Sequence, residues 1–125
     1  MTYDEFTEAF FCFLNLALSL SRKSRDEGIL SLEDSIDPEK AANREIFEYG
    51  MRFMIDGTDL EVIDKLLSNI INHEKNTHKS LLKTIEKEAV LMIGQGWNPR
   101  IILHLLYSYV DFPLSDPRFK ELLND

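Results

Sequence analysis

The histidines near the middle of the chain are the first candidates for metal chemistry. His73 and Glu74 are followed by His78, which begins like the zinc-binding motif of metalloproteases. That motif needs its two histidines four residues apart, so that both imidazoles lie on one face of a helix. Here the spacing is five residues, which places the imidazoles about 140° apart around a helix. We therefore predict no metal site and interpret both histidines as solvent-exposed.

The single cysteine, Cys12, is the other candidate for chemistry. It stands among Phe10, Phe11 and Phe13, so we expect a buried and unreactive thiol. One cysteine cannot form an internal disulfide, which fits a reducing compartment. The sequence also has no glycine-rich phosphate loop and no Cys/His pair with zinc spacing. We predict no catalytic residue, metal or cofactor; an enzyme would need a pocket with convergent polar groups, which sequence cannot reveal.

A basic cluster stands out in the polar stretch 21–33. Its members are Arg22, Lys23 and Arg25, and the stretch ends at Glu33. On one continuous helix, Arg25 and Glu33 would lie on roughly the same side, about 12 Å apart. The spacing predicts an exposed stripe of mixed charge. Most such stripes are merely solvated, because isolated surface charges contribute little to stability.

A second polar stretch, Gly96 to Arg100, combines an aromatic side chain with a cation. Arg100 is expected in the first turn of a helix, where the helix dipole disfavours a positive charge. We therefore expect a carboxylate partner, either in the fold or on another protein. Trp97 is either a lid over the core, the interpretation that we favour, or an anchor for a partner.

Composition narrows the class of partner. The chain has 125 residues, with 14 Lys and Arg against 22 Asp and Glu, giving a formal net charge of −8. An acidic surface repels phosphate backbones and anionic lipids, so nucleic acid and membrane surfaces are disfavoured as partners. The 44% hydrophobic content argues against disorder, and the length suits one domain over residues 1–125.

The longest apolar run, residues 9–20, does not predict a membrane span or a signal peptide. It follows acidic residues, the wrong charge for a signal peptide, and is shorter than the about 20 apolar residues that a bilayer crossing needs. We expect a soluble, cytoplasmic protein that covers this run with its own core or with another subunit.

Proline, glycine and capping residues divide the sequence into helices. A first helix from Asp4 to the mid-twenties is apolar on nearly every side. A second helix, with Asp37 as its N-cap, runs from Pro38 to Asp56 and is closed by Gly57 in a left-handed conformation.

Thr58 and Glu61 form the pattern of a capping box. The polar stretch 72–80 either lies within one long helix or separates two helices. No glycine or proline interrupts it, so we favour one long helix over about 58–94.

Two shorter helices follow, which start at Asn98-Pro99 and at Asp116-Pro117 with Asn98 and Asp116 as caps. The prediction is therefore an all-α, single-domain antiparallel bundle of about five helices. The helix from Pro99 is expected to bury five apolar side chains: Ile101, Ile102, Leu105, Leu106 and Tyr109.

Three of these stretches resemble the flagellar stator subunits of the MotA/TolQ/ExbB proton-channel family. Residues 21–33 resemble the signature that follows the second membrane helix of the family, and residues 50–61 resemble its second cytoplasmic signature. Residues 96–100, with Ser108 and Tyr109, are similar to the tail that follows the fourth membrane helix. The three motifs occur in the order of the family and span about residues 20–110.

The departures from the family are as informative as the matches. In the family, the third and fourth membrane helices separate the second signature from the tail, whereas here the polar stretch 72–88 joins them directly. The first two membrane helices are missing as well. The resemblance therefore implies a cytoplasmic body without a proton path. Asn69 and Ile70 stand where relatives tend to be acidic, which puts the contacts of that stretch in doubt.

The resemblance also implies a partner. In the family, an arginine and a glutamate of the first signature contact charged residues of the rotor protein FliG, and Arg25 and Glu33 match them in identity and spacing. Arg22 and Lys23 would add to the field. The leading hypothesis is a module that docks on FliG or on stator subunits through this mixed-charge helix face.

Further contacts and alternatives complete the hypothesis. Trp97 and Arg100 are candidates for a secondary partner contact. Phe6, Phe10 and Phe13 are candidates for self-association, because family members assemble as rings; a monomer that buries this helix is the alternative. A stand-alone helical adaptor that kept the fold without a motor role would show no charge-dependent rotor binding. An artificial fusion of cytoplasmic pieces is the remaining alternative.

Overall fold

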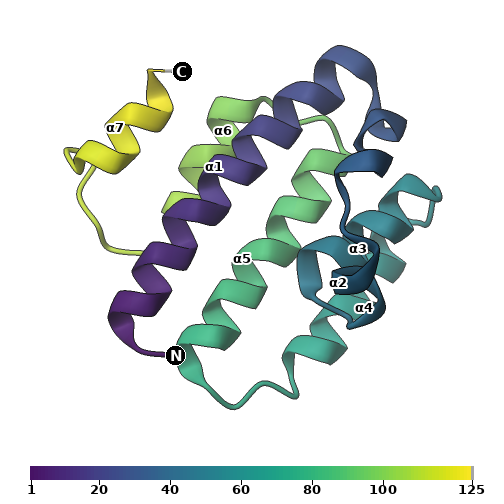
Figure 1. The fold of residues 1–125 in the computed structure, drawn as a ribbon, viewed down its shortest axis with the longest axis horizontal. Helices are drawn as coiled ribbons and strands as arrows, with labels where there is room; N and C mark the ends of the chain where they lie inside the picture. The colour runs from purple at the N-terminus through teal and green to yellow at the C-terminus, as the bar shows by residue number, and fades with distance from the viewer. Residues whose placement is uncertain (125) are drawn as a thin grey trace.

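The computed structural model describes residues 1–124, and every regular element among them is a helix (Figure 1). The all-α class is therefore confirmed. No helix in this described part of the chain combines the length and apolarity needed to cross a membrane. The elements in chain order are α1 (Tyr3–Glu27), the 3₁₀-helix η1 (Ile29–Ser35), α2 (Pro38–Ala42), α3 (Ile46–Ile55), α4 (Leu60–Ile71), α5 (Thr77–Gly94), α6 (Pro99–Tyr107) and α7 (Pro117–Leu123).

Helix α5 is the central element of the bundle. It packs against α1, α3, α4 and α6, and its Ile85, Ala89 and Val90 are fully buried. In Figure 1, α1 crosses in front of α6, and α5 lies between α1 and the α2–α4 group. Gly50 allows α3 to approach closely, because a Cβ there would lie 2.8 Å from Leu67 Cδ1. The apolar faces of five helices thus share one core.

The first helix forms as its sequence predicts. Thr2 and Glu5 make a capping box: Thr2 Oγ1 accepts from the Glu5 N–H at 3.2 Å, and Glu5 Oε1 accepts from the Thr2 N–H at 2.9 Å. The helix is buried on more than one side, because α5, α6, α7 and η1 all contact it. Its buried residues are Phe6, Phe10, Phe11, Phe13, Leu14, Ala17, Leu18, Leu20 and Ser21.

The second predicted helix is two helices. Asp37 caps α2 as predicted, accepting from the Glu39 N–H at 2.9 Å, and Gly57 has the predicted left-handed conformation after α3. Between them, Arg44 adopts a left-handed φ of 58° and separates α2 from α3. The break changes the direction of the chain, so that Ile46 and Phe47 at the start of α3 are buried in the core.

The predicted long helix over 58–94 is also wrong, because it divides into α4 and α5. Residues 72–76 are not helical, and polar side chains satisfy the backbone there. Asn76 Oδ1 accepts from the Lys79 N–H at 3.0 Å, while Glu74 accepts from the Asn76 N–H at 3.1 Å and pairs with Lys83 at 2.8 Å. The break lets α4 fold back on α5, which buries both apolar stripes.

The predicted capping box at the start of α4 does not form. Asp59, not Thr58, occupies the N-cap position, and its side chain makes no capping hydrogen bond. The preceding turn explains the difference, because the Thr58 N–H donates instead to the Phe53 carbonyl at 3.0 Å and closes the end of α3.

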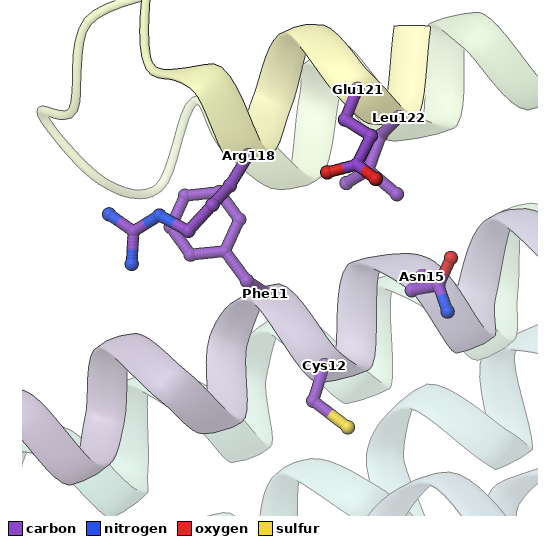
Figure 2. Close-up of a pocket in the computed structure, with 6 residues that line it drawn as sticks. All are labelled: Phe11, Cys12, Asn15, Arg118, Glu121 and Leu122. Atoms are coloured by element: carbon purple, nitrogen blue, oxygen red, sulfur yellow. The ribbon is translucent and has the colours of Figure 1, made fainter. Parts of the chain in front are cut away.

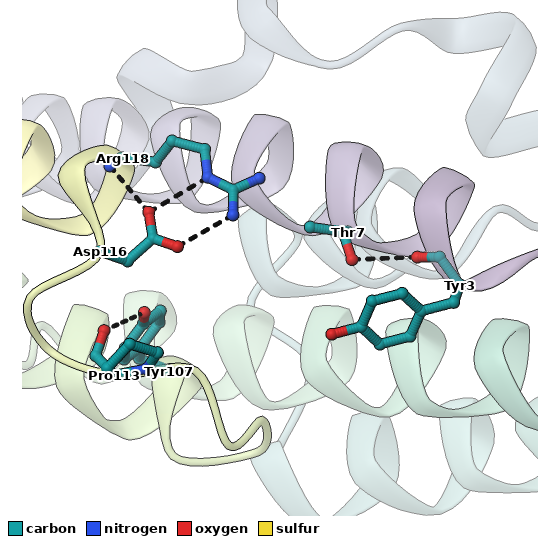
Figure 3. A network of polar contacts seen from close by, with 6 residues as sticks. All are labelled: Tyr3, Thr7, Tyr107, Pro113, Asp116 and Arg118. Carbon is teal, nitrogen blue, oxygen red and sulfur yellow. Dashed lines mark hydrogen bonds and ion pairs between the residues drawn. The ribbon is translucent and has the colours of Figure 1, made fainter.

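The two helix starts predicted at Asn98-Pro99 and Asp116-Pro117 are confirmed. Asn98 caps α6 and Asp116 caps α7, each accepting a backbone N–H two residues on. Helix α7 packs over α6, where the Phe119 and Tyr107 rings stack at 3.8 Å. The Tyr107 hydroxyl donates to the Pro113 carbonyl at 2.8 Å and fixes the connecting loop (Figure 3).

The buried face of α6 differs from the predicted one. Its buried residues are Ile102, Leu103, Leu106 and Tyr107. Ile101 and Leu105 are exposed, and so is Tyr109 just beyond the helix. Sequence could not separate the two apolar faces of this helix, because both carry large hydrophobic side chains.

Candidate partner-binding surface

The basic cluster lies on the last two turns of α1. Arg22 and Lys23 are partly buried, while Arg25 is exposed. Helix α1 is closed three residues beyond Arg25 by Gly28, whose φ of 90° leaves the helical region and whose N–H donates to the Ser24 carbonyl at 2.8 Å. The cations therefore stand at a helix C-terminus, where the dipole favours positive charge.

The 3₁₀-helix η1 brings Glu33 back toward this cluster. Buried Leu32 and Ile36 anchor it, and η1 packs against α1 and α3. Lys23 Nζ donates to Ser35 Oγ at 3.5 Å, which ties the end of η1 to α1. Because Gly28 interrupts the helix, the predicted single helix stripe is wrong. The two charges instead occupy a corner between two helices, and we call Arg22, Lys23, Arg25 and Glu33 the charged corner.

The charged corner is free of internal ion pairs. Within residues 1–124, no side chain of the corner lies within 4.0 Å of an opposite charge. Sequence reasoning missed Leu30, which is 67% exposed. In a 3₁₀-helix, residues three apart lie on the same side, so Leu30 and Glu33 share the outward face of η1. An unpaired acid and an apolar side chain therefore face solvent together.

The stretch with Trp97 and Arg100 connects α5 to the first turn of α6. Trp97 is 41% exposed and lines a groove between α5 and α6, so a large part of its ring is accessible to a partner. Arg100 has no carboxylate partner among the described residues, so a carboxylate on another protein, the second of the two expected sources, stays a prediction. Its Nη1 donates instead to the Leu123 carbonyl at 3.2 Å, in the last turn of α7. The negative end of that helix takes the place of the expected acid.

The three phenylalanines proposed for self-association lie in the core. Phe6, Phe10 and Phe13 are all buried within the chain. Phe6 stacks on the His78 imidazole at 5.5 Å, and Phe13 meets the Phe47 ring edge-on at 5.2 Å. Because the fold of their own chain covers them, these rings offer little surface to a second copy, and self-association through them stays a prediction.

Comparison with known proteins finds relatives of this sequence. Motility protein A of Borreliella burgdorferi is 37% identical over 79 residues, which are 61% of this chain and 29% of the relative. Motility protein A of Treponema phagedenis is 33% identical over 78 residues, and that of Treponema pallidum is 28% identical over 78 residues. This chain is similar to part of Motility protein A. The resemblance found from the three motifs is thereby confirmed.

The similarity to Motility protein A covers only part of this chain and only part of each relative. It covers about three fifths of this chain, and the chain spans 29% of the length of each relative. No protein-family model matches the sequence. No solved structure matches it either.

Of the two histidines near the middle of the chain, only His78 has a packing role. His73 is exposed as predicted, but His78 is partly buried against the rings of Phe6 and Tyr3. His78 Nδ1 also lies 3.4 Å from the Met1 carbonyl oxygen. In residues 1–124, no three His, Cys, Asp or Glu side chains come together as a metal site would require.

Cys12 is exposed, so the prediction of a buried thiol is wrong. Its neighbours on α1 point inward, whereas Cys12 lies on the open side, in a groove between α1 and α7 of about 350 Å³ (Figure 2). The Arg118 guanidinium lies 4.1 Å from the Phe11 ring centroid and is paired with Asp116 at 2.9 Å. The lining of this groove contains no histidine that could activate the thiol.

Two acidic side chains, Glu48 of α3 and Glu86 of α5, are partly buried where these helices pack together. Glu86 on α5 points at the start of α3, where its Oε1 accepts from the Phe47 N–H at 3.3 Å. Burial raises the pKa of Glu86 to about 8, and the nearby Glu48 carboxylate contributes to this increase. Burial also raises the pKa of Glu48, whose Oε2 has no hydrogen-bond partner. Only the packing of α3 on α5 brings these groups together, so no sequence pattern could reveal the pair.

Proposed function

We propose that this chain is a non-enzymatic, stator-like interaction module of the flagellar motor, which docks through its charged corner on the rotor protein FliG or on stator subunits. One observation carries the proposal: a chain similar to Motility protein A exposes Arg25 and Glu33 at one corner without internal ion pairs. A charge that has no partner in its own fold remains available to a partner protein.

The corner supports electrostatic docking. The three cations of α1 and Glu33 of η1 lie on either side of Gly28, with the exposed Asp26 and Glu27 between them, so the corner presents both signs of charge to a partner. Complementary charges orient and speed an encounter more than they tighten the complex. Leu30, on the same face as Glu33, adds an apolar contact that could slow dissociation. Buried Leu32 and Ile36 hold η1 in place, which limits the entropy lost on binding.

Equilibrium binding to the C-terminal domain of FliG, at low and high salt, tests this function. Arg25→Glu and Glu33→Lys should each weaken binding at low salt, because each reverses one charge of the corner. Glu8→Lys and Lys120→Glu are matched controls: both positions are exposed, and Glu8 lies about 25 Å from Arg25 along α1. The controls should bind like the wild type.

The alternative function is a stand-alone helical adaptor or scaffold. It is supported by a second exposed surface, the apolar face of α6, which does not involve the charged corner. An adaptor would bind FliG neither at low salt nor at high salt, and reversal of Arg25 would change nothing.

A further inference from the structure

Three separate segments of the chain bring aromatic rings together at one end of the bundle. Tyr3 comes from the first turn of α1, His78 from the first turn of α5, and Phe112 from the loop between α6 and α7. Together with Phe6 and Tyr109, these rings line a pocket of about 400 Å³, which we call the aromatic pocket. Its volume lies within the range of small-molecule sites, roughly 300–1,000 Å³.

The rings of the aromatic pocket meet at steep angles and form walls instead of a stack. The Tyr3 ring is nearly perpendicular to the Phe112 ring, at 89°, with the two centroids 6.3 Å apart. It meets the His78 ring at 67°, with the centroids 6.1 Å apart. Because an aromatic face carries partial negative charge, walls of this kind attract a cation that lies within about 6 Å of the ring centroids.

One carboxylate, that of Asp111, also lines the aromatic pocket. Within residues 1–124 this carboxylate takes part in no ion pair. Among the described residues, no lysine or arginine lines the pocket, and Arg118 on the nearby α7 is already paired with Asp116 at 2.9 Å. A cation held by the rings would therefore meet an available negative charge, in a chain whose formal net charge is −8.

The walls of the aromatic pocket are held in place by contacts within the chain. The capping box at Thr2 fixes the first turn of α1. The Tyr107 hydroxyl donates to the Pro113 carbonyl at 2.8 Å, which holds the loop that contributes the carboxylate. Phe6 stacks on the His78 ring, with the centroids 5.5 Å apart. A preformed site loses less conformational entropy when a ligand binds.

We propose that the aromatic pocket binds a small organic cation with a quaternary ammonium group, held by the aromatic walls and by the carboxylate of Asp111. Quaternary ammonium groups are recognised by aromatic cages through cation–π attraction. A primary ammonium is strongly hydrated and carries three N–H donors, which a single carboxylate satisfies only in part. A quaternary ammonium has no N–H donor, so aromatic rings replace its water at lower cost. The pocket lies outside the charged corner, so this proposal does not depend on FliG binding.

Titration of the full chain with choline, followed by the NMR signals of the aromatic side chains, tests the proposal. At pH 8, where an ordinary imidazole is neutral, we expect saturable shifts of the pocket rings and a dissociation constant in the millimolar range. The neutral isostere dimethylbutanol, in which carbon replaces the nitrogen of choline, should bind at least about threefold more weakly. Equal binding of the two compounds overturns the proposal, and so does an absence of choline binding at tens of millimolar.

Single substitutions separate the contribution of the charge from that of the rings. Asp111→Asn should weaken choline binding about twofold to fivefold and leave the binding of the neutral isostere unchanged. Asp34→Asn, at an exposed position on η1, is the matched control and should bind like the wild type. Tyr3→Leu should also weaken choline binding about twofold to fivefold, whereas Tyr3→Phe keeps the ring and should not. Equal affinities of Asp111→Asn and Asp34→Asn, or of Tyr3→Leu and Tyr3→Phe, overturn the proposal.

Two further probes decide which kind of molecule carries the ammonium group. Lysine blocked at both ends represents the side chain of a partner protein, and phosphatidylcholine vesicles represent a lipid surface. Weaker binding of both probes than of choline, compared per ammonium group, supports a small-molecule ligand. Tighter binding of either probe assigns the pocket to a protein or to a lipid surface and overturns the proposal.

Discussion

The carboxylate of Glu86 accepts a hydrogen bond from the backbone N–H of Phe47 at 3.3 Å, so that a side chain of α5 caps the first turn of α3. Helix α3 has no side-chain cap of its own, because Glu45 at its N-cap position makes no such bond. An orphan N–H at a helix start is normally satisfied by a residue of the same chain segment. Here the cap comes from 39 residues further along the sequence.

This contact predicts an unusual pH dependence of stability. The pKa of Glu86 is raised from its ordinary 4.5 to about 8 in the folded chain. Between these values the folded state holds a proton that the unfolded state has released, so the free energy of unfolding falls as pH rises. Glu86→Gln keeps an acceptor for Phe47 but cannot ionise. It should be more stable than the wild type by about 1–3 kcal/mol at pH 8, on the scale of a buried carboxyl.

Urea unfolding of both proteins at several pH values checks this prediction. The difference should shrink toward zero near pH 4, where Glu86 is protonated in both states. Glu86→Ala is the control, since it removes the cap as well as the charge and should gain less than Gln. A Glu86→Gln variant that is less stable than the wild type at every pH would contradict the assigned role.

The loop between α4 and α5 gives a second prediction. Asn76→Ala removes the side chain that accepts from the Lys79 N–H and should destabilise the chain by about 1 kcal/mol. A continuous helix through this stretch would give the opposite sign, because alanine is a better helix former than asparagine. The thermal unfolding midpoint of Asn76→Ala decides between a loop and a continuous helix at residues 72–76. Asn69→Ala, at an exposed position inside α4, should be neutral or slightly stabilising.

The close approach of α3 to its neighbours gives a third prediction. Gly50→Ala places a methyl group 2.8 Å from Leu67 Cδ1 and 3.1 Å from Val90 Cγ2. Overpacking of this kind should cost about 1–3 kcal/mol, more than the gain in helix propensity. Chemical denaturation measures the loss, and Ser19→Ala on the exposed side of α1 is the control. An unchanged midpoint would show that the helices can move apart at no cost.

Leu30 gives a fourth prediction, which concerns binding alone. Leu30→Ala should weaken binding to the FliG C-terminal domain by about 1 kcal/mol, as expected for an apolar contact at an interface. Stability should change by less than about 0.5 kcal/mol, because the side chain is largely solvated. Leu114→Ala, at a similarly exposed loop position, is the control for both measurements. Equal losses for the two variants would deny Leu30 a specific role.

Local signals in the sequence account for much of the fold. Asp37, Asn98 and Asp116 each precede a proline, and each caps a helix as predicted. The apolar pattern of residues 9–20 correctly indicates a helix buried on more than one side. These features depend on residues within one turn of each other, which a single sequence contains in full.

The errors arise where tertiary contacts outweigh the local pattern. Residues 72–76 contain no helix breaker, yet the chain turns there because folding α4 onto α5 buries both stripes. Arg44 breaks another helix by adopting a positive φ, which glycine would have signalled. Cys12 lies among phenylalanines but on the open side of α1. Apart from Asn76, which caps α5 and could have signalled its start, none of these outcomes has a marker in the sequence.

The sequence predicts the residues of the candidate site but not its geometry. Arg25 and Glu33 are exposed near each other along the chain, as expected, but Gly28 places them on two helices instead of one. Leu30 has no signal in the sequence, because only the 3₁₀ geometry of η1 sets it beside Glu33. The spacing of apolar residues in α6 predicts a buried stripe but on the wrong face, because either face of that helix is apolar enough to be buried.

The association rate of the chain with the FliG C-terminal domain, measured at low and high salt, tests the central claim most directly. We predict that the wild type associates faster at low salt, and that Arg25→Glu and Glu33→Lys each remove most of that acceleration while Glu8→Lys does not. At high salt the four proteins should associate at similar rates, because the charges are screened. Absence of wild-type binding at several hundred micromolar, or equal rates for all four proteins at low salt, would contradict docking through the charged corner.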